Sequence, residues 1–199
     1  MGVTAQNNNK EEYKLSSIVS AGIGYGGAWW LTGGIGSNGN SGTSTYSIVD
    51  KKKTSPTISV GYEYVLKKKL GIGYLGAGAR FCYQSAVWTE TTQSSSYNSE
   101  WKWRWNIYDL SLRATYHFIL PNKPKIEPYA GLSPSYVIWK MKYTFDSPYY
   151  NSYSEESYHI PEVLSVFGGV RFRVLKLISL FGELGYPYSW ATIGANLQF

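Results

Sequence analysis

Residues 154–159 contain the side chains of a hydrolytic triad. Glu155, Ser157 and His159 would supply its acid, nucleophile and base. Such a site needs a fixed geometry, however, and residues so close together along one polar loop do not provide it. The second histidine, His117, belongs to a patterned segment elsewhere in the chain. The sequence therefore predicts no catalytic residue, and an enzyme is kept as an alternative.

Glycine strings are a second candidate for chemistry. The pattern G-x-G-x-x-G begins at Gly22, at Gly34 and at Gly71. A dinucleotide site needs this string between a parallel strand and a helix, and no helical pattern follows any of the three. A single cysteine, Cys82, allows neither an intramolecular disulfide nor a zinc cage. We therefore expect no cofactor-binding and no metal-binding residues.

The third candidate is a set of charged side chains that share one parity of alternating segments. Buried charges must pair, so we expect a neutral network of ion pairs with Glu183 between Arg80 and Arg113. We also expect the acids Glu63 and Glu127 to meet two arginines of one segment. The set comprises Glu63, Arg80, Asp109, Arg113, Glu127, Arg171, Arg173 and Glu183.

The segments that would position these charges alternate with a period of two, which is typical of β-strands. At the end of the chain, for example, Ile193, Ala195 and Leu197 alternate with Gly194 and Asn196. The pattern predicts eight strands and no helix. They cover residues 15–25, 57–66, 75–83, 110–118, 126–138, 164–172, 178–186 and 190–199.

The composition agrees with one all-β domain. The 199 residues are 43% apolar and 17% aromatic, and they include 21 glycines, which argues against a helical bundle, a coiled coil or a disordered tail. The chain contains no run of 18 uninterrupted apolar residues, so the sequence predicts no transmembrane helix. The net charge is +6, but the lysine triplets 51–53 and 67–69 are expected in solvated turns. We therefore expect no nucleic-acid partner, and an anion contact at Lys51, Lys52 and Lys53.

The connections between the predicted strands alternate in length. Short ones lie at residues 67–69, 121–124, 175–176 and 187–189, and long polar ones at residues 32–55, 91–100 and 146–159. An even number of strands with short turns at one end and long loops at the other is typical of an antiparallel, up-and-down transmembrane β-barrel. We assign residues 13–199 to this domain and residues 1–12 to a flexible remnant left by signal-peptide removal.

Aromatic residues gather at the ends of the apolar parity. Such residues form two girdles at the water interfaces of a membrane barrel. At the short-turn end these are Tyr62, Tyr64, Tyr116, Phe118 and Phe199. At the loop end we expect Trp29, Trp30, Trp88, Trp101, Trp103, Trp105, Trp139 and Trp190.

The chain resembles the small eight-stranded outer-membrane proteins of Gram-negative bacteria, the OmpA transmembrane domain and OmpX family. The resemblance is sharpest at the C-terminal signal for the barrel-assembly machinery, whose places are filled by Thr192, Gly194, Leu197 and Phe199. It implies a bacterial outer-membrane location, periplasmic termini, extracellular loops and the assembly machinery as a partner. Adhesins, lipid-modifying enzymes and small channels share this fold, so the fold alone selects no activity.

The function predicted from the sequence is that of a barrel with a plugged lumen. Its long loops would serve surface binding, adhesion or envelope integrity, with outer-membrane lipid or lipopolysaccharide and a surface protein or glycan as partners. An outer-leaflet lipid-modifying enzyme and a very narrow channel are the alternatives. Residues 72–89, 101–118 and 126–145 are longer than the 9 to 11 residues that span a membrane. We expect their hairpins to project beyond it as a twisted ribbon.

Overall fold

The computed structural model describes residues 17–26, 46–94, 98–147, 152–186 and 190–199. The predicted remnant, residues 1–12, lies outside this range, as do Trp29 and Trp30. The described residues form β1 (Ser17–Tyr25), β2 (Tyr46–Thr54), β3 (Thr57–Leu70), β4 (Gly73–Ser94), β5 (Asn98–Phe118), β6 (Ile126–Asp146), β7 (Ser152–Arg173), β8 (Ile178–Tyr186) and β9 (Ala191–Gln198). No helix in this part of the chain is long and apolar enough to cross a membrane.

Eight of these strands close into a barrel. Antiparallel pairs join β1, β3, β4, β5, β6, β7, β8 and β9 in that order, and β9 pairs back with β1. The closing seam runs from Ile18 opposite Gln198 to Tyr25 opposite Ala191. Closure leaves the barrel wall without an unpaired edge. The predicted all-β, eight-stranded antiparallel barrel is confirmed, with a strand at each of the eight predicted places.

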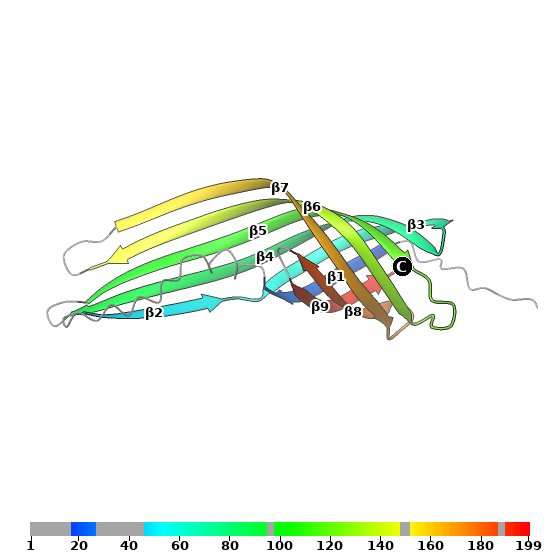
Figure 1. Cartoon of the computed structure of the whole chain (residues 1–199), viewed down its shortest axis with the longest axis horizontal. Coiled ribbons are helices and arrows are strands. Elements are labelled where there is room, and N and C mark those ends of the chain that lie inside the picture. Colours follow the sequence, from blue (N-terminus) through cyan, green and yellow to red (C-terminus); the bar gives the residue numbers. More distant parts are fainter. Residues whose placement is uncertain (1–16, 27–45, 95–97, 148–151, 187–189) are drawn as a thin grey trace, which may run out of the picture.

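Four of the barrel strands continue beyond the closed part, and a ninth strand joins them (Figure 1). β2 pairs with the outer half of β4, from Thr54 opposite Ala86 to Tyr46 opposite Ser94. The order β2, β4, β5, β6, β7 therefore forms an open five-stranded sheet, which we call the extension. It comprises residues 46–54, 84–94, 98–107, 137–146 and 152–160. The predicted segments 72–89, 101–118 and 126–145 are thus strand over nearly their whole length, and their projection beyond a membrane stays a prediction.

Three predicted loops are wrong in their extent because they contain strand. Residues 91–100 and 146–159 lie largely in the long hairpins β4–β5 and β6–β7. Residues 46–54 of the predicted loop 32–55 form β2, so Lys51, Lys52 and Lys53 lie in a strand and not in a turn. These segments are strand because their backbones form hydrogen bonds with neighbouring strands. Their polar side chains give no alternating pattern that would reveal this in the sequence.

The turns at the opposite end are short. They connect β3 to β4, β5 to β6 and β7 to β8. The first falls at Gly71, whose φ of +61° lies in the left-handed region that glycine adopts without a Cβ clash. The predicted turn at residues 67–69 is therefore displaced: these lysines still belong to β3, beside a register shift between Val65 and Lys69.

The barrel is apolar outside and polar inside. Outward side chains such as Ile193 and Leu112 are 71% and 65% exposed. Inward positions carry small or polar residues, and Ser59, Ser111 and Thr192 among them are buried. A water-soluble sandwich would reverse this arrangement, with its apolar parity in the core.

Candidate functional site

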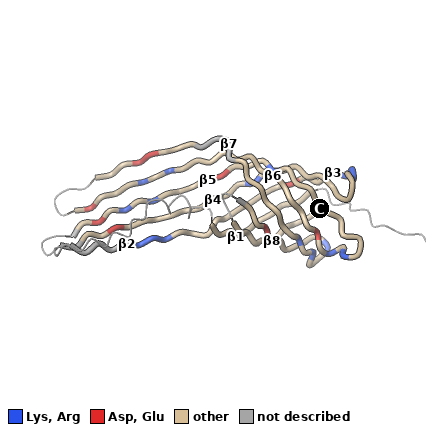
Figure 2. The backbone as a smooth tube through the Cα atoms, in the orientation of Figure 1, with Lys and Arg blue, Asp and Glu red and all other residues tan. Residues whose placement is uncertain are grey.

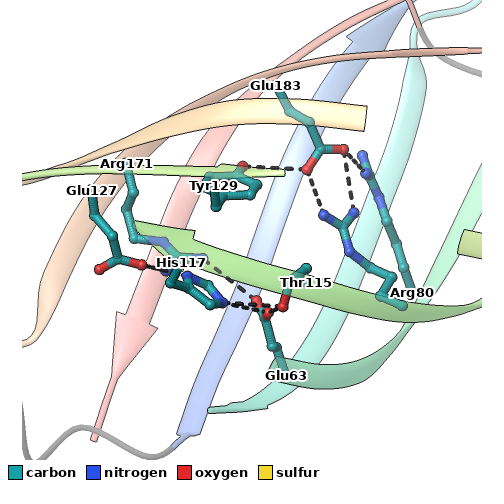
Figure 3. A network of polar contacts seen from close by, with 9 residues as sticks. Glu63, Arg80, Thr115, His117, Glu127, Tyr129, Arg171 and Glu183 are labelled. Atoms are coloured by element: carbon teal, nitrogen blue, oxygen red, sulfur yellow. Dashed lines mark hydrogen bonds and ion pairs between the residues drawn. The ribbon is translucent and has the colours of Figure 1, made fainter. Parts of the chain in front are cut away.

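Glu183 of β8 lies at the centre of a first cluster of charges in the lumen (Figure 3). Arg113 of β5 donates two hydrogen bonds to its carboxylate, with Nη2 to Oε2 at 2.6 Å and Nη1 to Oε1 at 3.2 Å. Arg80 of β4 forms an ion pair with Oε1. The hydroxyl of Tyr129 donates a fourth hydrogen bond, to Oε2 at 3.2 Å. Glu183 is thereby joined to three other strands.

A second cluster lies nearer the short turns and centres on His117. Its Nε2 is 2.8 Å from Oε1 of Glu63, and its Nδ1 is 2.7 Å from Oε1 of Glu127. Arg171 donates to Glu127 at 2.5 Å and lies 3.6 Å from Oε2 of Glu63. Thr115 donates to Glu63 as well. Two carboxylates are thus held by an arginine, a histidine and a hydroxyl.

The two clusters link six of the eight barrel strands, from β3 to β8. The interior of an eight-stranded barrel is only wide enough to be filled by side chains or by one small ligand. Ion pairs that cross it fasten opposite walls to each other. The network therefore fills part of the lumen, as a plug, and holds opposite walls of the barrel together, as a brace.

Three aromatic rings fill the space beside these charges. Phe167, Phe181 and Tyr129 point inward and are buried. Most other apolar side chains of their strands point outward. The guanidinium of Arg113 lies 3.8 Å from the ring centre of Phe167, and that of Arg171 lies 5.1 Å from the ring centre of Tyr129. A desolvated cation over a ring face is attracted by its quadrupole. The rings therefore stabilise the same arginines that pair with the carboxylates.

Inward glycines provide room for these rings. A Cβ at Gly131 would lie 2.5 Å from Cζ of Phe167, and one at Gly194 would lie 2.6 Å from Cε1 of Phe181. Real Cβ atoms do not approach other atoms so closely. Packing thus explains why Gly131 and Gly194 are glycine.

An apolar layer closes the lumen above the charges. Ala86, Ile107 and Val137 are buried together, and Trp105 and Trp139 pack against them. A cavity of about 40 Å³ lies between this layer and the Glu183 cluster, and a second of about 20 Å³ lies between the two charge clusters. Each is large enough for one or two water molecules and for nothing larger.

Two further residues predicted in the lumen lie at other depths. Asp109 is buried beside the larger cavity, and its Oδ1 has no hydrogen-bond partner among the described residues. No ion pair of Asp109 occurs in the described ranges, so its expected pairing is absent there. Arg173 lies one inward position beyond Arg171 on β7, toward the short turns.

Sequence reasoning left three members out of the network: Thr115, His117 and Tyr129. All three share the parity of a charged residue of the same strand, two positions away for Tyr129 and Thr115 and four positions away for His117. Tyr129 follows Glu127, and Thr115 and His117 follow Arg113. The inward position of His117 follows from the sequence, but its contacts with two carboxylates do not.

The aromatic residues of the extension lie on its lumen-side face. Directly opposed pairs share a face, and Trp88 opposes Trp103, which opposes Tyr143. This parity is continuous with that of Arg80 and Cys82 inside the barrel. The predicted girdle is therefore wrong for Trp88, Trp101, Trp103, Trp105 and Trp139.

Tyrosines instead form the aromatic girdle, which we call the tyrosine ring, on the outward side of the barrel mouth. Tyr83 and Tyr108 oppose each other with ring centres 5.3 Å apart, and Tyr136 stacks on His159 at 6.0 Å. Trp190 is 45% exposed at the same end. At the short-turn end, Tyr62, Tyr64 and Phe199 are exposed as predicted.

Lys and Arg positions recur along the strands of the extension (Figure 2), and the register places several of them on its outward face. Lys53, Arg104 and Lys142 lie at one level of the register, since Lys53 opposes Val87, Val87 opposes Arg104 and Arg104 opposes Lys142. Lys51 and Lys102 lie one level further out. Lys52 points to the other face, with its Nζ 5.6 Å from the ring centre of Trp88. A groove of about 310 Å³ on the outward face is lined by Glu100, Lys102, Arg104, Lys142, Thr144 and Asp146.

Glu155, Ser157 and His159 lie in sequence along β7 on the outward face of the extension. Glu155 accepts a hydrogen bond from Tyr153 at 2.7 Å, and the ring of His159 stacks on Tyr136. No hydrogen bond joins the three residues to one another within the described chain. The arrangement lacks the contacts of a triad.

Three residues of the predicted assembly signal lie on β9, and Phe199 directly follows it. Thr192 is buried inside and Gly194 also points inward, whereas Leu197 and Phe199 are exposed outside. The main chain of Phe199 exchanges two hydrogen bonds of 3.0 Å with Ser17. These residues complete the closing seam of the barrel.

No protein-family model matches the chain, and no curated protein matches it. Among solved structures, the chain is similar to Ail, the attachment invasion locus protein of Yersinia pestis, in complex with the heparin analogue sucrose octasulfate. The sequences are 14% identical, the match covers 92% of this chain and 99% of Ail, and the TM-score is 0.46. A second structure of Ail has 12% identity and a TM-score of 0.42. Neisserial surface protein A has 12% identity, coverage of 92% and 97%, and a TM-score of 0.34.

Proposed function

We propose that this chain is an integral barrel of the bacterial outer membrane that acts in surface binding and adhesion. The observation that carries the proposal is the extension, an open sheet that stands on a closed barrel with an apolar exterior and a filled lumen. We place the termini in the periplasm and the extension outside the cell. The barrel-assembly machinery would insert the chain by recognising β9.

The exposed apolar belt supports the membrane location. Leu184, Ile193 and Leu112 are each more than 60% exposed, and similar side chains surround the whole barrel. A contiguous apolar surface of this kind aggregates in water and is stable against lipid tails. Tyrosines at both ends of the belt suit the two water interfaces.

The extension supports a binding role. Its four long strands continue the rigid barrel wall, so groups at its tip are held far from the bilayer at a fixed orientation. A rigid surface loses little conformational entropy when it binds. A surface protein or a glycan is the class of partner that such a sheet can reach.

Envelope integrity is a second function, favoured by the basic outward face. Lys51, Lys53, Lys102, Arg104 and Lys142 lie just beyond the tyrosine ring on the lipid-facing side. Phosphate groups of outer-leaflet lipopolysaccharide would lie at that height, and guanidinium and ammonium groups bind them well. Replacing Lys102 and Arg104 by glutamate should reduce the lipopolysaccharide that copurifies with the protein, measured as bound phosphate.

The alternatives have less support. A narrow channel would need a continuous water path, but ion pairs and an apolar layer occupy the lumen. A lipid-modifying enzyme would need a nucleophile, a base and an orienting acid in contact, and Glu155, Ser157 and His159 are not so arranged.

A shortened variant tests the adhesion proposal. Residues 88–103 and 141–156 are each replaced by Asn-Gly, which joins directly opposed positions of the long hairpins by a two-residue turn. The barrel should still shift on gels between an unheated and a heated form, while binding of expressing cells to host cells or matrix should be lost. Unchanged adhesion by the shortened variant would refute the proposal.

A further inference from the structure

An array of five aromatic rings covers the lumen-side face of the extension. Trp88 and Trp103 stack with ring centres 4.5 Å apart, and Trp103 and Trp101 stack at 6.2 Å with an interplanar angle of 13°. Tyr143 lies 5.6 Å from Trp103, and Phe145 lies 4.3 Å from Trp101. We call these five residues the aromatic array.

The array forms because of the register. Trp88, Trp103 and Tyr143 occupy one row across three strands, and Trp101 and Phe145 lie in the next row. Cross-strand pairing fixes the rings side by side in two rows, with Tyr143 and Phe145 tilted by 44–48° to the tryptophans. All five rings are half-buried, so part of each is open in the region that the structure describes.

Two indole donors near the array have no acceptor. Nε1 of Trp88 and Nε1 of Trp139 are inaccessible to solvent and make no hydrogen bond with any described residue. A buried donor without a partner costs free energy. Because both atoms are covered by protein, an occupant of this face would meet the exposed parts of the rings and not these donors.

The charges beside the array are mixed. Lys52 lies over Trp88. Glu90 opposes Trp101, and Glu156 opposes Met141 on the same face, where it accepts a hydrogen bond from Tyr158. A polyanion would meet two carboxylates here, whereas a neutral hydroxylated ligand could use the lysine as a donor and the carboxylates as acceptors.

Lipid tails are a poor occupant, because the array continues the lumen parity and is separated from the lipid-facing belt by the thickness of the sheet. We propose that the aromatic array binds a neutral oligosaccharide, whose C–H faces would pack on the exposed parts of the rings and whose hydroxyls would bond to Lys52 and the carboxylates. The inference rests on the proposed function and names the class of partner. It assigns saccharide binding to one face and lipid phosphate to the other.

Binding is tested on the full chain in detergent with two neutral hexasaccharides, cellohexaose and chitohexaose, and a heparin-derived hexasaccharide. Tryptophan fluorescence and calorimetry follow each titration. We expect saturable binding of a neutral hexasaccharide, weakened about tenfold or more by Trp101→Ala or Trp103→Ala, since each removes one stacking surface. Trp190→Ala and Lys102→Ala are the matched controls and should leave it unchanged.

Several outcomes would overturn the inference. These are no saturable response to either neutral hexasaccharide, binding that survives both array variants while they keep the heat shift on gels, or binding of the heparin fragment alone with dependence on Lys102. Deletion of residues 27–45 that raises acrylamide quenching of the array would assign this face to the chain itself. Adhesion that depends on the extension without saccharide binding would refute this inference and leave the proposed function intact.

Discussion

The carboxylate of Glu183 accepts hydrogen bonds from Arg80 and Arg113 in a buried site. Glu183→Ala would leave two guanidinium groups without a counter-charge. Removing one partner of a buried ion pair costs about 3–5 kcal/mol. We expect the free energy of unfolding to fall by that amount in urea titrations of the protein in lipid bilayers.

Glu100→Ala is the control for this experiment. Glu100 is exposed on the outward face of the extension, and its loss should change the free energy of unfolding by no more than about 0.5 kcal/mol. If Glu183→Ala were equally mild, the brace assigned to the lumen network would be refuted.

Gly131 offers a second test at a single residue. A Cβ there would lie 2.3 Å from the carbonyl oxygen of Ala114 and 2.5 Å from Phe167, so Gly131→Ala must move the backbone or the ring. We expect a loss of about 1–3 kcal/mol in unfolding free energy, as for other overpacked sites.

Gly182 is the matched glycine, since nothing lies within 4 Å of a Cβ at that position. Gly182→Ala should be neutral or stabilise by about 0.5 kcal/mol, because alanine loses less conformational entropy than glycine on folding. Equal losses of unfolding free energy for the two substitutions would refute the explanation that Gly131 makes room for the ring of Phe167.

The sequence indicates which side chains face inward, and with them the approximate depth of each charge. It does not indicate that His117 bridges two carboxylates, because this depends on the register between β3, β5 and β6. Nor does parity indicate that Asp109 lies between the ion pairs and the apolar layer, where its Oδ1 has no partner among the residues that the structure describes.

Among the elements, the eight barrel strands were predictable because lipid outside and side chains inside impose strict alternation. The outer parts of β4, β5 and β6 are predictable up to residues 89, 101 and 145 because the patterned segments are longer than a membrane span. The outer half of β7 is not, because its polar side chains resemble a loop. β2 was hidden for a similar reason. Its lysines resemble a solvated loop, yet lysine is common on edge strands, where it discourages pairing with other chains.

Edge and central strands of the extension should differ toward trypsin. Lys51, Lys52 and Lys53 lie on the edge strand β2, paired on one side, whereas Lys102 and Arg104 of β5 are paired on both sides. Cleavage requires local unpairing, which costs less at an edge. Limited proteolysis followed by mass spectrometry should therefore detect cuts at residues 51–53 well before cuts at Lys102 or Arg104.

Early cleavage at Lys102 and Arg104 would instead mean that the long hairpins open readily. In that case the extension would be a set of mobile loops, and the rigid platform that the aromatic array requires would be absent.

At the scale of the whole molecule, the filled lumen predicts an electrically silent barrel. Ion pairs, three buried rings and the apolar layer leave cavities of about 40 Å³ and 20 Å³. Purified protein inserted in planar bilayers should show no steady single-channel current. The double variant Arg80→Ser with Glu183→Ser empties the middle of the plug, and small, noisy currents from it would show that the silence of the unaltered protein comes from the network.

The seam between β1 and β9 joins Ile18 to Gln198, so the two strands that close the ring are among the most distant in sequence. Pairing of β1 with β9 stabilises the barrel only after every intervening hairpin has formed, and contacts of high sequence separation form slowly. During synthesis the apolar faces of the earlier hairpins therefore have no closed structure to join. The longer the barrel stays open, the longer these apolar faces can aggregate. Any factor that brings β9 to β1 early shortens that interval.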